Sequence, residues 1–220
     1  YVPFGSYEER AWREKIENTQ MVAELSVDFA VPSVEAYGRY LDLTHGENHL
    51  GFIVYSIPSV ELQRFTTHSF QHMLDNPNEH PYKYFMRIAS HLGHSARELH
   101  QSGYVHRQLH LSNFYHLEDK DKLCIMDWAT MIPIAETGRE PAMKRAIDIV
   151  IPLQGVERHV NTFFTFLSSD DKGTFRDGFF AGQLSAYGGA DDGKSFEIIV
   201  YLDRGNFDPL IDFLDSQNAK

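Results

Sequence analysis

The sequence predicts an α+β fold, and three observations support this prediction. A helical pattern at 7–25 is followed by two stretches with strand character at 31–43 and 50–57. The clearest amphipathic helix of the chain then spans 81–102. A mostly apolar stretch at 145–167 predicts further helix. Strands are therefore expected mainly in the first part of the chain and helices mainly in the second.

The composition limits the functional classes. Of the 220 residues, 42% are hydrophobic and 23% are charged, which is typical of a globular domain. The net charge of −11 and the scattered Lys and Arg side chains argue against nucleic acid as a partner. No stretch approaches the roughly 20 apolar residues of a membrane span. The single cysteine, Cys124, excludes an intrachain disulfide and favours an intracellular, cytoplasmic location. Because the chain begins at Tyr1 without a methionine, we expect a processed, trimmed or partial chain.

The N-terminal elements are predicted from capping and turn signals. Ser6 can cap the helix 7–25, with Glu9 three residues later as in a capping box. A polar turn separates the two strands, so we expect them to form a hairpin. A short helix is expected next, at 61–74.

The helix 81–102 is followed by a second pair of strands. Pro81 suits the first turn of this helix and Gly103 its C-terminal end. Short strands are expected at 114–117 and 123–126, on either side of a charged turn. One face of the helix carries apolar residues at steps of three and four: Phe85, Ile88, Ala89, Leu92, Ala96 and Leu99.

The last third of the chain gives weaker signals. The stretch 145–167 is expected to be helical, with Pro152 indicating that the helix starts late. The segment 168–194 is rich in Gly, Asp and Ser, so we expect a loop with short helical pieces. A strand is expected at 196–202 and a terminal helix at 208–216.

Two short motifs flank the predicted hairpin 114–126. The sequence HRQLHLSN at 106–113 follows the amphipathic helix, and DWA stands at 127–129. This resembles the protein-kinase-like superfamily, in which HRDLxxxN and DFG mark the catalytic loop and the metal loop. The resemblance implies a kinase-like fold with a reduced N-terminal lobe, made of a helix and a β-hairpin, and a mainly helical C-terminal lobe. It divides the chain into a partial N-lobe-like region 1–57, a C-lobe-like region 58–167 and a divergent extension 168–220.

The resemblance also implies roles for individual residues. Asn113 and Asp127 would bind Mg²⁺, since their side-chain oxygens are suitable hard ligands, and through it the phosphates of ATP. The alternative for both is a turn or capping role. Glu17, or Glu14, stands in the place of the family's conserved glutamate on the first helix. Asp148 would accept hydrogen bonds from the backbone of the catalytic loop.

The chain departs from the family pattern at the catalytic position. The aspartate is replaced by Gln108, whose amide cannot act as a general base and could merely fill space. His110 replaces a lysine that the family often has there, and it could contact phosphate or act as a substitute base. Trp128 stands in the place of the DFG phenylalanine and can fill the same apolar slot. A Gly-rich loop and a strand with the ATP-binding lysine are not visible in the sequence.

Three functions are compatible with these features. The leading hypothesis is a degenerate kinase, or pseudokinase, that acts mainly through contacts with another protein and retains at most residual binding of Mg-ATP. The alternative is an active nucleotide-dependent transferase, moving AMP or a phosphoryl group, with Gln108 in place of the aspartate. A small-molecule phosphotransferase ranks third, because that class also needs the aspartate.

Histidines are unusually frequent between residues 45 and 116. His68 and His72, and also His91 and His94, have spacings that place two imidazoles on one helix face. Zinc would need such a pair and a third ligand. A surface or interface role is the simpler expectation for these histidines.

Overall fold

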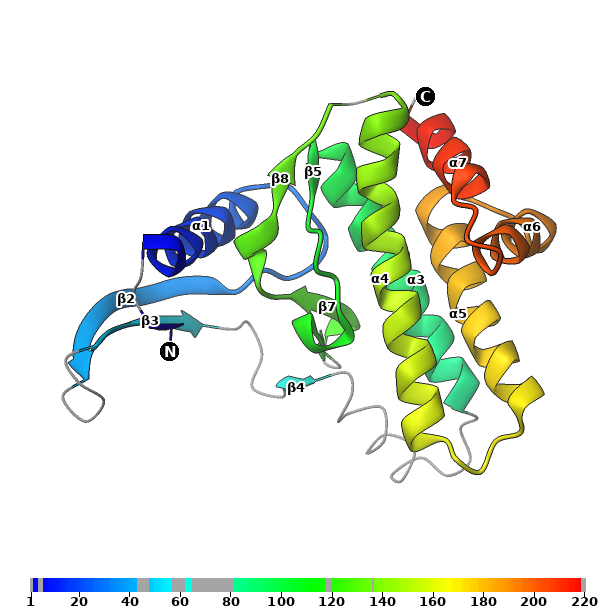
Figure 1. The fold of residues 1–220 in the computed structure, drawn as a ribbon, viewed down its shortest axis with the longest axis horizontal. Helices are drawn as coiled ribbons and strands as arrows, with labels where there is room; N and C mark the ends of the chain where they lie inside the picture. Colours follow the sequence, from blue (N-terminus) through cyan, green and yellow to red (C-terminus); the bar gives the residue numbers. More distant parts are fainter. Residues whose placement is uncertain are drawn as a thin grey trace.

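The protein has the α+β architecture that the sequence predicts, with α1 and the long hairpin in its N-terminal part and mainly helices in its C-terminal part (Figure 1). The computed structural model describes residues 2–3, 6–42, 48–56, 62–64, 81–117, 120–135 and 137–218. None of the helices in these ranges has both the length and the apolar character needed to cross a bilayer.

The N-terminal part consists of one helix and a small antiparallel sheet. Helix α1 (Ser6–Ala23) precedes strands β2 (Ser33–Asp42) and β3 (Asn48–Ser56), which form the expected hairpin. Strand β1 (Val2–Pro3) pairs with β3 on its other side. Trp12 anchors α1 on this sheet, because its buried indole meets the ring of Tyr37 edge to face at 5.8 Å.

A second small sheet contains the hairpin between the two motifs. Strands β6 (Phe114–Leu117) and β7 (Lys122–Ile125) pair in an antiparallel manner, as expected. The helix predicted at 61–74 is wrong at Leu62–Arg64, which form strand β4 beside β6, and the rest of that stretch lies outside the described residues. Pairing with an existing strand edge offers these residues backbone hydrogen bonds that the local sequence does not reveal.

Helix α3 (Pro81–Gln101) leads directly into the first motif. Gly103 follows it with a φ of 85°, which confirms the predicted glycine stop. Strands β5 (Tyr104–Val105) and β8 (Ile132–Pro133) then pair and bring the two ends of the motif region together.

Helix α4 (Arg139–Phe163) is longer than expected. The prediction of a late start at Pro152 is wrong, because the proline lies inside the helix. Burial of one face outweighs the local cost of the proline, since tertiary packing overrides helix propensity. The buried residues of this face are Ala142, Ala146, Ile149, Val156 and Val160.

The C-terminal segment forms three helices, and two expectations are wrong here. The predicted loop 168–194 contains helix α5 (Ser169–Gly188), and the predicted strand 196–202 belongs to helix α6 (Asp192–Leu202). Helix α7 (Asp208–Asn218) matches the expected terminal helix. The side chain of Asp191 caps α6 by accepting a hydrogen bond from the Lys194 amide at 2.7 Å, which favours helix for an apolar run that is also compatible with a strand.

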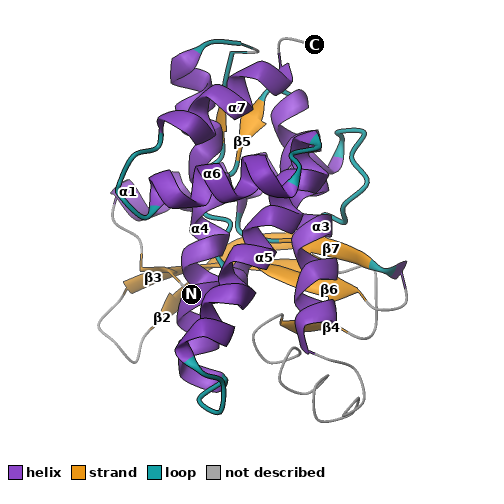
Figure 2. Cartoon of the chain, turned by 90° about the vertical axis from the view of Figure 1, so that its right-hand side faces the viewer, coloured by secondary structure: helices purple, strands orange, loops and turns teal. Residues whose placement is uncertain are grey.

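The hydrophobic core joins α3, α4 and α5, which lie against one another in both views (Figures 1 and 2). The rings of Phe85 and Phe164 have centroids 5.7 Å apart, and Phe175 from α5 packs on both. The segment after residue 168 therefore shares one core with the helix that precedes the first motif.

Candidate functional site

Asp148 fixes the beginning of the loop 106–113. Its carboxylate is fully buried on α4 and accepts hydrogen bonds from the amides of His106 at 2.7 Å and Arg107 at 2.6 Å. These are the backbone contacts that the resemblance implies for this residue. His100 adds a third contact, with Nε2 3.1 Å from the same carboxylate and Nδ1 2.9 Å from the hydroxyl of Tyr187.

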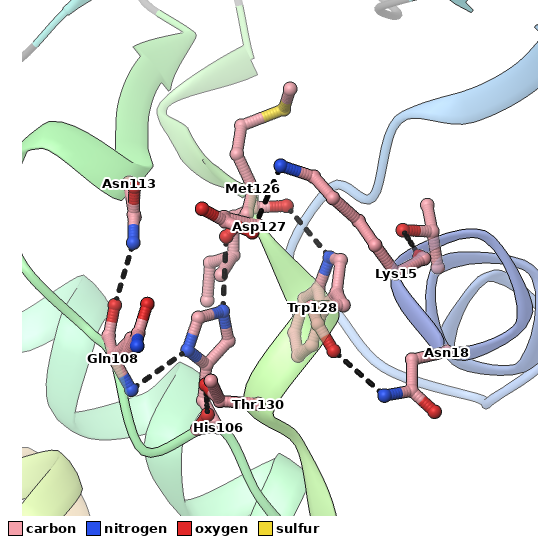
Figure 3. Close-up of polar contacts among 11 residues, drawn as sticks. Lys15, Asn18, His106, Gln108, Asn113, Met126, Asp127, Trp128 and Thr130 are labelled. Carbon is pink, nitrogen blue, oxygen red and sulfur yellow. Dashed lines mark hydrogen bonds and ion pairs between the residues drawn. The ribbon is translucent and has the colours of Figure 1, made fainter. Parts of the chain in front are cut away.

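His106 connects the two motif loops. Its Nδ1 accepts a hydrogen bond from the Gln108 amide at 3.2 Å, and its Nε2 donates to the carbonyl of Met126 at 3.0 Å (Figure 3). Burial lowers the pKa of His106. The ring is therefore neutral with its proton on Nε2, and it holds the loop before Asn113 against the residue before Asp127.

Gln108, His110 and Asn113 are brought together by a compact set of hydrogen bonds. The carbonyl of Gln108 accepts from the His110 amide at 2.8 Å and from Nδ2 of Asn113 at 2.8 Å. The carbonyl of Asn113 in turn accepts from the Met126 amide at 2.7 Å. Asn113 and Asp127 thus lie at one end of the β6–β7 hairpin, whereas the His110 side chain is exposed.

Asp127 has a left-handed backbone with φ 63° and ψ 63°. Non-glycine residues adopt this conformation at a cost, and such positions concentrate at functional sites. Arg107, with φ 69°, is another. The two left-handed residues thus belong to the two motif loops that His106 joins.

Helix α1 supplies two residues that the sequence did not identify. Nζ of Lys15 lies 2.9 Å from a carboxylate oxygen of Asp127, and Nδ2 of Asn18 donates to the carbonyl of Trp128 at 2.8 Å (Figure 3). Lys15 borders the apolar stripe of α1, because it directly precedes Ile16 and lies about one helical turn after Trp12. The sequence carries no local signal for this contact, because a lysine beside an apolar stripe is ordinary on a helix surface.

Trp128 fills the apolar space under this loop, as expected for the residue in the phenylalanine position. It is fully buried and stacks on Phe29 with ring centroids 6.0 Å apart. Its indole nitrogen donates to the carbonyl of Ile125 at 3.1 Å. Trp128 therefore makes an apolar contact with its ring and satisfies its one polar group.

Glu17 lies outside this cluster. Its side chain is exposed, while Glu14 forms an ion pair with Arg10 at 2.7 Å. The structure therefore brings Asn113, Asp127 and Gln108 together but leaves Glu17 at the surface of α1. Among the described side chains of α1, Lys15 places its ammonium group against Asp127.

Strand β3 contributes Tyr55 near the same carboxylate. Burial raises the pKa of Tyr55 to about 12, and the negative charge of Asp127 contributes to this shift. The phenol is therefore neutral at physiological pH and adds no second negative charge beside Asp127.

The side-chain oxygens of Asn113 and Asp127 are suitable ligands for a hard cation, but Lys15 already contacts one of them. Asn113 uses its Nδ2 for the bond to Gln108, so its amide oxygen is the atom that can bind Mg²⁺ together with the carboxylate of Asp127. Lys15 already neutralises that carboxylate. A magnesium ion at Asp127 would therefore share this carboxylate with the ammonium group of Lys15 or displace it.

Comparison with known proteins finds similar structures but no similar sequence family. No protein-family model matches the chain, and no curated protein matches it. WaaP, solved in complex with acyl carrier protein, is 16% identical with a TM-score of 0.47, over 97% of this chain and 75% of that chain. The pseudokinase PEAK1 (Sugen Kinase 269) is 9% identical with a TM-score of 0.48, over 91% of this chain and 79% of that chain. Similarity at this level concerns the course of the backbone alone.

Proposed function

We propose that the chain is a degenerate kinase-like domain, a pseudokinase, that acts mainly through contacts with another protein. The observation that carries this proposal is the ion pair between Lys15 and Asp127, with 2.9 Å between Nζ and the carboxylate oxygen. An ammonium group at the expected metal ligand neutralises its charge, so the loop is held in place without Mg²⁺.

The kinase-like part of the proposal is supported by the loop contacts. Asp148 accepts hydrogen bonds from the two residues before Gln108, and His106 joins this loop to the one that carries Asp127. The family resemblance implies the contacts of Asp148, whereas the junction made by His106 is found only in the structure. A chance match of the two sequence motifs would not explain why their loops are joined by these hydrogen bonds.

The residue at position 108 supports the loss of catalysis. Phosphoryl transfer in kinases uses a carboxylate to orient the attacking hydroxyl and accept its proton. Gln108 has an amide instead, which does not accept a proton at physiological pH. Its backbone carbonyl also receives the hydrogen bond from Asn113, so the position has a structural role that is independent of catalysis.

An apolar groove between α4 and α7 supports the role in protein contacts. It encloses about 540 Å³, and exposed Met143, Ile147 and Phe207 contribute to its lining. Exposed apolar patches of this kind are typical of surfaces that bind other proteins. We propose an intracellular location for this activity, since the lone thiol of Cys124 is buried and needs no oxidising compartment.

Thermal unfolding in the presence of Mg-ATP tests this proposal. The parent protein is expected to show no shift of its unfolding temperature. A ligand at a hundredfold excess over its Kd would stabilise the protein by about 2.7 kcal/mol, which is readily detected. Asp127→Ala serves as the matched variant. A shift in the parent protein that disappears in this variant would sink the pure interaction role.

The second candidate is an active nucleotide-dependent transferase. One observation favours it: Lys15 places a cationic group beside Asp127 without the lysine strand that the family uses. In this case Lys15 would bind the phosphates of the nucleotide. ATP labelled on the α- or γ-phosphate distinguishes the two chemistries, because AMP transfer moves the first label and phosphoryl transfer the second.

A further inference from the structure

The turn after β6 brings two histidines and one carboxylate to a single point. Nε2 of His91, from α3, lies 3.1 Å from Oδ1 of Asp121, and Nε2 of His116, from β6, lies 3.2 Å from the same oxygen. All three potential ligand atoms lie within 4.8 Å of one another. The cluster is at the end of the β6–β7 hairpin opposite to Asn113 and Asp127.

We propose that His91, His116 and Asp121 form a zinc-binding site. Zinc binds histidine nitrogen and carboxylate oxygen at about 2.0–2.2 Å, so a tetrahedral site separates neighbouring ligand atoms by roughly 3.3 Å. Two of the three separations in the cluster, 3.1 and 3.2 Å, already have this length. The third separation, between the two imidazole nitrogens, is no longer than 4.8 Å and would have to shorten toward the tetrahedral value when zinc binds.

The three residues belong to parts of the fold that are held in place. The His116 ring is almost fully buried and packs edge to face on Tyr84, with centroids 5.8 Å apart. The His91 ring lies 6.1 Å from that of His116. Asp121 has a left-handed backbone with φ 46°, and Asp is one of the few residues that tolerate this conformation. The turn therefore points its carboxylate at both imidazoles.

Three protein ligands leave a fourth position open. His91 and Asp121 line a cavity of about 280 Å³, which also reaches His94 on the next turn of α3. An open position of this kind takes water or an added ligand in zinc sites with three protein ligands. Two imidazoles favour zinc over Mg²⁺, which prefers oxygen ligands only.

Arg87 carries a positive charge at the site and would have to give way to the ion. Nε of Arg87 lies 3.8 Å from Oδ1 of Asp121, and its guanidinium also lies 5.5 Å above the ring of Tyr84. Both members of this ion pair are well exposed, so the pair is weak and a divalent cation can replace it. Arg87→Gln is therefore expected to tighten zinc binding.

A zinc ion in this position would tie α3 to the β6–β7 hairpin. That hairpin carries Asn113 before its first strand and Asp127 after its second. The proposed ion therefore connects α3 to the far end of the hairpin, and it is independent of nucleotide binding.

Zinc titration of the chelator-treated full chain by calorimetry tests the site. The expected result is one zinc ion per chain, and no binding of Mg²⁺ at this site. His91→Gln and Asp121→Asn should each weaken zinc binding at least about 100-fold, because loss of even a supporting group at a zinc site costs about 10–100-fold. Asparagine also tolerates the left-handed backbone at position 121, so this variant changes the ligand and preserves the turn.

Two controls separate the site from other histidines and from the motif loops. His94→Gln, on the same helix, and Asp127→Asn, at the other end of the hairpin, should leave the zinc affinity unchanged. Cobalt added in place of zinc should give visible absorption in the parent protein and lose it in Asp121→Asn. The proposal is overturned if no one-to-one binding occurs, or if His91→Gln binds zinc as tightly as the parent protein. Loss of binding in the His68→Gln/His72→Gln double variant would also overturn it, because the ion would then bind at those histidines.

Discussion

Buried histidines act at the scale of single residues. His100 and His106 hold the motif loops through defined hydrogen bonds, and burial lowers the pKa of each. Burial also lowers the pKa of His159 to about 4, where it packs against Phe85 and Phe164. All three rings are neutral in the folded protein near pH 7, so the fold depends on their remaining uncharged.

Acid should therefore weaken the fold, and His159 allows the effect to be measured. The unfolded chain binds a proton at this residue near pH 6.5, whereas the folded protein does so only near pH 4. The neutral ring therefore contributes fully to the free energy of unfolding above pH 6.5. This contribution is lost as the pH falls from 6.5 to 4, because only the unfolded chain binds the proton in this range. The loss amounts to about 3 kcal/mol for the single ring. Urea unfolding of the parent and His159→Gln from pH 7 to pH 4 should show a flatter curve for the variant, and parallel curves would contradict the assignment.

Close packing of α3 against α5 is the main feature at the scale of the elements. A Cβ atom at Gly93 of α3 would clash with the backbone carbonyl of Gln183 in α5. On the other side of this contact, a Cβ atom at Gly178 would clash with the Tyr82 ring, and one at Gly182 with Met86. Gly178 and Gly182 lower the helix propensity of α5 and also let its backbone approach α3.

Gly93→Ala should destabilise the protein by about 1–3 kcal/mol or more, because the backbone of α5 has to move. Gly173→Ala is the matched control within α5. A Cβ atom at Gly173 meets nothing within 4 Å, so this change should stabilise the helix by roughly 0.5–1 kcal/mol. Urea unfolding measures both values. Equal effects of the two substitutions would mean that helix propensity, and not close packing, explains the glycines.

The sequence predicts elements with strong local signals and misses those that depend on tertiary contacts. Helix α3 and the hairpin β6–β7 are found nearly to the residue, because amphipathic periodicity and a turn mark them. Helix α5 is missed because its glycines signal loop until the neighbouring helix is known. Helix α6 is missed because a short apolar run fits strand and helix equally well.

The candidate site shows the same limit at the scale of the whole molecule. The motif spacing predicts that Asn113 and Asp127 lie at one end of the hairpin. The family resemblance implies the contact of Asp148 with the loop, and the structure contains this contact. The contacts of Lys15 and Asn18 join α1 to a loop more than a hundred residues later. A contact across that distance leaves no local pattern, since both residues are also ordinary on a solvent-facing helix surface.

The ion pair between Lys15 and Asp127 decides between the two candidate functions. Both side chains are about one-third exposed, so Lys15→Met is expected to cost less than about 1 kcal/mol of stability. The variant should therefore fold, and its binding behaviour can be interpreted. Removal of the ammonium group frees the carboxylate for a cation without changing Gln108 or Asn113.

The most direct test is the affinity of Lys15→Met for Mg-ATP, compared with that of the parent protein by calorimetry. If Lys15 replaces the metal at Asp127, the parent protein binds weakly or not at all and the variant gains affinity. The double variant Lys15→Met/Asp127→Asn should lose that gain. Tight binding by the parent protein that is abolished in Lys15→Met would contradict the account, because Lys15 would then serve to bind the nucleotide.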